Sequence, residues 1–177
     1  MKATQCMFLL LFLLAFAPAS RAADDGFGGV TCGGDVAKAL VGKKLSNEAD
    51  SVVENRHKNL ALKDLGGDEI SDAIFLSTWT ICGSDYFLTL KRGVVSDVLK
   101  LPAHSGAEKA FDGDCTKGKT PVPGVIVGIL VDQPGSDALP AKSAWKLDGE
   151  TGKFTSIPAE GLTCARHGII FPDGEKK

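Results

Sequence analysis

The sequence predicts a mainly β protein of the β-rich α+β class. We expect an antiparallel sheet or a small, partly open barrel of about six or seven strands, with one short N-terminal helix and disulfide closure. Two observations predict it: hydrophobicity alternates with a period of two from residue 74 onward, and the one clear helical pattern precedes the strands. A doubly wound parallel fold would need helices between strands, and the connections are too short for them.

Residues 1–22 have the features of a secretory signal peptide. Lys2 gives a basic start, an unbroken apolar run covers Met7–Ala17, and small residues lead to Ala22, after which we expect cleavage; cleavage after Ala19 is the alternative. The run is shorter than the roughly 20 residues that cross a bilayer, and no second apolar span follows, which disfavours an uncleaved anchor. We therefore expect a secreted or periplasmic protein with no membrane span in the mature chain.

Charge then limits the class of partner. Removing 22 of the 177 residues leaves 155, and because the removed segment holds Lys2 and Arg21 but no acids, the formal charge goes from −2 to −4. Proteins that bind nucleic acid or anionic membranes concentrate Lys and Arg on one face, and no such cluster occurs. The expected partner is a protein or a small molecule, with no nucleic acid.

Four cysteines remain after cleavage, an even number that predicts two disulfides in an exported chain: Cys32, Cys82, Cys115 and Cys164. Four cysteines allow three pairings, and the sequence does not choose among them. We expect Cys32 with Cys82 and Cys115 with Cys164, each joining a loop to the sheet. A four-cysteine zinc site is the alternative, but such sites present close C-x-x-C pairs, which are absent here.

The domain plan is simple. Residues 23–34 are rich in glycine and are expected to form a flexible lead-in, 35–171 a single β-rich domain, and 172–177 a frayed tail. Asp35 is a suitable N-cap for a short helix whose apolar stripe ends near Gly42. The ambiguous stretch 47–63 is compatible with a second, irregular helix.

Strands are expected from residue 74. Residues 74–82 are apolar on both faces, as in an interior strand, and two further strands with short turns complete an antiparallel meander. Residues 102–123 are polar and rich in glycine and proline, and we interpret them as a long loop. The remaining strands of the prediction are 86–91, 94–101, the buried run 124–131, the hairpin 143–147 with 153–157, and 168–171.

One motif invites a nucleotide-binding interpretation. Gly113–Thr120 matches the phosphate-binding pattern G-x-x-x-x-G-K-[ST] letter for letter. That site needs a helix directly after the loop, and Pro121 and Pro123 forbid one. We interpret the match as accidental and expect no cofactor.

A cluster of acids is the weak candidate for a metal site. The cluster lies in and around the segment 66–69, which we interpret as a turn, and consists of Asp64, Asp68, Glu69 and Asp72. Clustered oxygen ligands of this kind suit calcium. The alternating ligands and final glutamate of a calcium loop are absent, so a solvated acidic turn is the preferred interpretation.

The sequence contains no catalytic motif that we recognise. His57, His104 and His167 are scattered, and no G-x-S-x-G elbow occurs. The preferred hypothesis is an exported, disulfide-stabilised binding module, with an inhibitor of a secreted hydrolase as one form and the loop 102–123 as its contact surface. The alternatives are a small hydrolase or metal-assisted enzyme and a structural cell-envelope component. Weak candidates for binding are His104, Lys117 and Lys119.

Overall fold

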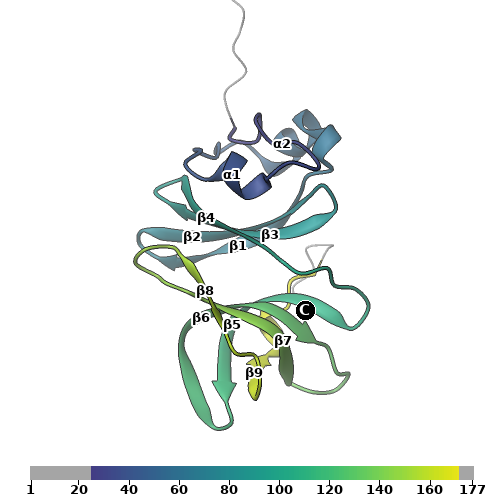
Figure 1. Cartoon of the computed structure of the whole chain (residues 1–177), viewed down its shortest axis with the longest axis vertical. Helices are drawn as coiled ribbons and strands as arrows, with labels where there is room; N and C mark the ends of the chain where they lie inside the picture. Colours follow the sequence, from purple (N-terminus) through teal and green to yellow (C-terminus); the bar gives the residue numbers. More distant parts are fainter. Residues whose placement is uncertain (1–24, 172–177) are drawn as a thin grey trace, which may run out of the picture.

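The computed structural model describes residues 25–171, arranged in three layers (Figure 1). Helices cover one face of a four-stranded antiparallel sheet, and a second antiparallel unit packs against the other face. The prediction of a mainly β, antiparallel, disulfide-closed fold is confirmed. The predicted signal peptide and the C-terminal tail lie outside the described residues. No helix between residues 25 and 171 has the length and composition of a membrane span.

The N-terminal layer consists of two short helices and a 3-10 turn that pack on a buried apolar cluster. The predicted first helix is α1 (Val36–Leu40), and the carboxylate of its N-cap Asp35 accepts the Lys38 amide at 3.0 Å. A second helix, α2 (Asp50–Arg56), and the 3-10 turn η1 (Lys58–Leu60) fill the ambiguous stretch.

The segment before α1 differs from the flexible lead-in that its glycines predicted. Within the described part, Asp25, Phe27 and Val30 are buried. Phe27 and Val30 belong to the apolar cluster beneath the helices, so the glycines let the chain turn closely while these side chains enter the core.

The first sheet, sheet A, is a meander in the order β1-β2-β3-β4. Side chains alternate along β2, so that Trp79 and Ile81 face the helical layer while Leu76 faces the second unit. The sequence did not predict β1: its segment 66–69, expected to be a turn, pairs with β2 instead. The strands are β1 (Lys63–Ser71), β2 (Ile74–Ile81), β3 (Ser84–Lys91) and β4 (Val94–Lys100).

The second unit is a small closed barrel. Strand β5 pairs with β6 and β9, and β7 pairs with the same two strands, so that these four strands form a closed ring. Strand β8 pairs with β7. Its interior holds Phe111, Leu139 and the Cys115–Cys164 pair. The strands are β5 (Glu108–Lys117), β6 (Thr120–Val131), β7 (Ala138–Leu147), β8 (Phe154–Ile157) and β9 (Leu162–Ala165).

Two sequence expectations are wrong in this unit. The loop expected at 102–123 is largely the β5–β6 hairpin, because inward-facing Phe111 and Cys115 anchor an otherwise polar strand. The strand expected at 168–171 is replaced by the turn η2 (Arg166–Gly168) and one bridge between Ile169 and Phe111.

Both disulfides join the expected partners. Cys32–Cys82 ties the N-terminal layer to the turn after β2, with the Cα atoms 5.5 Å apart. Cys115–Cys164 links directly opposed positions of β5 and β9. Each bond of this kind contributes about 2–4 kcal/mol, chiefly by restricting the unfolded chain.

Candidate functional site

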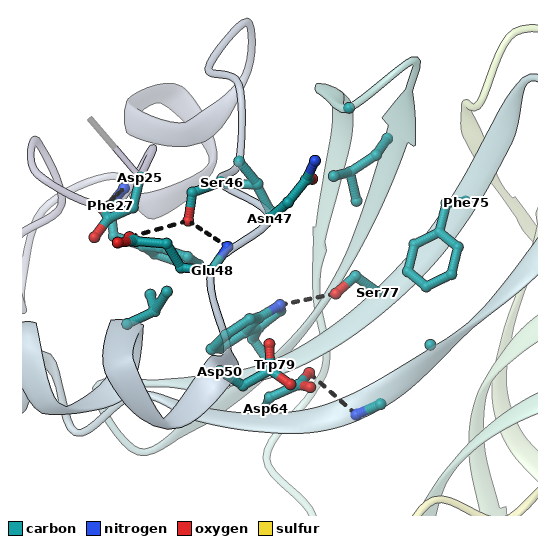
Figure 2. Close-up of a pocket in the computed structure, with 16 residues that line it drawn as sticks. Asp25, Phe27, Ser46, Asn47, Glu48, Asp50, Asp64, Phe75, Ser77 and Trp79 are labelled. Atoms are coloured by element: carbon teal, nitrogen blue, oxygen red, sulfur yellow. Dashed lines mark hydrogen bonds between the residues drawn. The ribbon is translucent and has the colours of Figure 1, made fainter. Parts of the chain in front are cut away.

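A cavity of about 370 Å³ lies between the N-terminal layer and sheet A. Figure 2 shows its two sides: the N-terminal loop carrying Ser46 to Glu48, and the strand residues Phe75, Ser77 and Trp79. Its lining combines aromatic rings, carboxylates and glycines. The residues that carry the argument are Asp25, Phe27, Glu48, Asp50, Asp64, Gly66, Gly67, Phe75 and Trp79.

The alternation of β2 makes the aromatic floor. Residues 75, 77 and 79 share one face, and the Trp79 indole N–H donates to Ser77 Oγ at 2.8 Å. Phe27 packs on Trp79 with the ring centroids 5.0 Å apart. Phe75 is 43% exposed, since the helical layer stops short of it. One aromatic ring is thus open to a ligand.

Gly67 creates the space in which the Phe75 ring lies. A Cβ at this position would come within 2.7 Å of the ring and 2.3 Å of the Leu76 carbonyl oxygen. Any side chain here would displace the ring or the neighbouring strand. The glycine therefore shapes the apolar end of the cavity.

Two of the lining carboxylates, Asp25 and Glu48, are paired with Arg56. Arg56 bridges Asp25 and Glu48, with Nη2 donating to Glu48 Oε1 at 3.0 Å, and His57 Nε2 lies 2.8 Å from Asp25 Oδ1. Burial by itself would raise the pKa of Asp25, but the hydrogen bonds from His57 and Arg56 outweigh it and hold that pKa below its usual value. This network fixes the loop that forms one wall.

A second carboxylate group has the opposite character. The packing of α2 on β1 brings Asp50 and Glu54 to Asp64, whose backbone N–H donates to Glu54 Oε1 at 2.8 Å. Burial is the main cause of a raised pKa at Asp64; together with the nearby Asp50 and Glu54, and against the lowering effect of the Gly66 amide, it brings that pKa to about 6. Figure 2 shows the carboxylates of Asp50 and Asp64 close to each other in the wall of the cavity. In this carboxylate cluster, which we define as Asp50, Glu54 and Asp64, the Asp64 carboxyl retains a proton at higher pH than a free carboxylate does.

The acids considered for calcium are distributed along an extended strand. Asp64, Asp68 and Glu69 lie on β1 and Asp72 in the turn after it, and Asp64 alone of these lines the cavity. In the described part of the chain, no three acidic, histidine or cysteine side chains form a set that could hold a metal ion.

The structure separates the three candidate binding residues. His104 lies in the β4–β5 connection, whereas Lys117 and Lys119 lie at the tip of the β5–β6 hairpin. The nine residue steps of β5 that separate these ends span about 30 Å. They do not form one contact surface.

The histidines do not assemble a catalytic base with a nucleophile. Nδ1 of His104 lies 2.9 Å from the Pro102 carbonyl oxygen, and Nε2 lies 3.2 Å from Asp85 Oδ2. Both ring nitrogens therefore already have a partner. His57 pairs with buried Asp25, and His167 lies elsewhere, on η2.

No family model, curated protein or solved structure matches this chain. The site therefore rests on its own geometry. Sequence reasoning did not single out Phe75, Trp79 or Asp50 as site residues. The alternation of β2 was the available signal for the aromatic row, whereas the meeting of Asp50 with Asp64 depends on helix packing.

Proposed function

We propose that this protein is an exported, disulfide-stabilised binding module whose cavity takes a small amphipathic cation, an ammonium group on an apolar body. One observation carries the proposal: the same cavity holds the neighbouring carboxylates of Asp50 and Asp64 and the open ring of Phe75 (Figure 2). Disulfides persist in oxidising compartments, which supports the exported location.

The carboxylate pair favours a positive charge. The raised pKa of Asp64 means that, through burial first and then through nearby Asp50 and Glu54, the negative charge of this carboxylate is disfavoured in the folded protein. A bound ammonium would supply the same positive charge together with up to three hydrogen-bond donors. Asp25 and Glu48 are already paired with Arg56 and His57, so the attraction is concentrated at the cluster.

The aromatic end favours an apolar body. Phe75 offers an exposed ring beside Gly67, and the indole N–H of Trp79 is already satisfied by Ser77. The floor therefore offers apolar area at this end and few hydrogen bonds. A cavity of about 370 Å³ is of the size that small organic ligands occupy.

The test is calorimetric titration of the mature protein with 2-phenylethylamine. 2-Phenylethanol, the uncharged analogue, is the matched ligand control, and Nα-acetyl-lysine methylamide tests whether the cation can be a lysine side chain. We expect the amine to bind and the alcohol to bind at least about tenfold more weakly, a difference of about 1.4 kcal/mol.

Variants locate the binding. Asp50→Asn and Phe75→Leu are each expected to weaken amine binding several-fold, whereas Asp114→Asn, which removes an exposed carboxylate from the barrel, should leave it unchanged. Equal binding of amine and alcohol, no binding of either amine, or equal losses in all three variants would refute the proposed function.

A further inference from the structure

A second hollow of about 500 Å³ lies on the other face of β1, between sheet A and the barrel. We call it the junction groove. Glycines and one buried threonine form much of it, and the end of the described chain forms one wall. The residues that matter are Gly66, Thr78, Asp112, Gly168 and Phe171.

Thr78 lies in the floor of this groove. It is 1% exposed, and its hydroxyl oxygen has no hydrogen-bond partner. Its cross-strand neighbours are Phe87 on β3 and Gly66 on β1. Gly66 has no side chain, and it lines the groove together with Thr78. An unsatisfied buried hydroxyl costs about 1–3 kcal/mol, a cost that a ligand group could remove.

The opposite wall is held firmly in place. Gly168 packs so closely on β5 that a Cβ there would come within 2.0 Å of the Asp112 carbonyl oxygen. The Ile170 amide donates to the Ala110 carbonyl oxygen at 3.0 Å, and Ile169 forms a bridge with Phe111. The wall that follows η2 is therefore preformed.

The surroundings of Thr78 define the chemical class of the ligand. A threonine hydroxyl both donates and accepts, so a ligand hydroxyl, which also does both, matches it. The other polar lining groups include the carboxylates of Asp64, Asp68 and Asp112, which accept hydrogen bonds, while Ile169 and Phe171 offer apolar surface. A molecule with several hydroxyls and an apolar face fits this combination.

We propose that the junction groove is a binding site for a small polyol of the monosaccharide class, with one ligand hydroxyl bonded to Thr78. The groove lies on the opposite face of sheet A from the cation cavity, and Thr78 lines the groove but not that cavity, so a different residue tests each proposal. Asp64 and the Gly66–Gly67 segment line both hollows.

The test combines binding with stability. The probes are methyl glucoside, methyl galactoside and N-acetylglucosamine, titrated by NMR into the mature protein and its variants. Thr78→Val keeps the side-chain shape and removes the hydroxyl, so it should raise the unfolding temperature of the free protein while lowering the affinity for the best sugar about tenfold. Ser143→Ala removes another unpartnered buried hydroxyl, one that does not line the groove, and should leave sugar binding unchanged.

The outcomes separate clearly. Binding that Thr78→Val weakens and Ser143→Ala preserves supports the groove, and unchanged 2-phenylethylamine binding by Thr78→Val shows that the cavity is intact. Failure of all three sugars to bind overturns the proposal, as does equal affinity in the wild type and Thr78→Val. A lower unfolding temperature for Thr78→Val would show that the hydroxyl is already satisfied, and would also overturn it.

Discussion

Replacing Asp64 by asparagine should stabilise the protein at neutral pH. The pKa of this carboxyl is about 6 in the folded protein, against an ordinary value of 3.8. Asparagine has nearly the same shape and retains an oxygen that can accept the Gly66 amide, which now donates to Asp64 Oδ1 at 3.1 Å. The substitution therefore removes the charge while keeping the local geometry.

The expected gain in unfolding free energy follows from the difference between the folded and ordinary pKa values of Asp64. A difference of about two pKa units corresponds to about 3 kcal/mol, and because Asp64 is only partly buried, solvent screening reduces the expected effect to about 1–2 kcal/mol. A carboxyl with a raised folded pKa disfavours folding when it is ionised. The penalty is complete above about pH 6, declines as pH falls toward about 4, and disappears once both states are protonated.

Urea unfolding of the wild type and Asp64→Asn, with disulfides intact, measures this directly. The gain in unfolding free energy should be about 1–2 kcal/mol near pH 7.5 and close to zero near pH 4. Asp114→Asn, on the exposed side of β5, is the control and should show little pH-dependent gain. A gain independent of pH, or a loss near pH 7.5, would refute the electrostatic account of the carboxylate cluster.

Three further predictions concern the walls and the ligand. Arg56→Gln leaves Asp25, which is 2% exposed, with His57 and the Phe27 amide but without its guanidinium, and should cost about 2 kcal/mol in urea unfolding near pH 7; no loss would show that the ion pair is not stabilising. Gly67→Ala should lower stability by about 1–3 kcal/mol because its methyl would meet Leu76 and Phe75, and a thermal melt identical to wild type would contradict this packing. Amine affinity, followed by calorimetry, should fall about tenfold between about pH 7.5 and pH 5, because protons compete for the carboxylate cluster; constant affinity would place the cation elsewhere.

Local patterns predicted the elements whose chemistry is local. Strand β2 is apolar on both faces, and Asp35 caps α1. Both features depend only on residues close in sequence, so the sequence pattern predicted them. Strand β1 was not predicted because its Gly-Gly-Asp-Glu segment favours a turn unless an adjacent strand holds it extended. In β5, two inward side chains, Phe111 and Cys115, were too few to produce a visible alternation.

The candidate site was harder to predict because its chemistry is assembled by tertiary packing. Asp50 belongs to a helix and Asp64 to a strand, and their meeting follows from how α2 lies against β1. Phe75 lies on an alternating strand, but its exposure depends on where the helical layer ends. Neither fact is encoded in the spacing of neighbouring residues.

Strand β1 also bears on how copies of this protein behave at high concentration. It forms one edge of sheet A, where unpaired backbone groups would invite a second chain to add as a strand. Two register shifts interrupt β1, and the acids Asp64, Asp68 and Glu69 give it negative charge. Irregular pairing and like charge at a sheet edge disfavour the addition of a second copy as a further strand, so the residues that complicate β1 also make it a poor template.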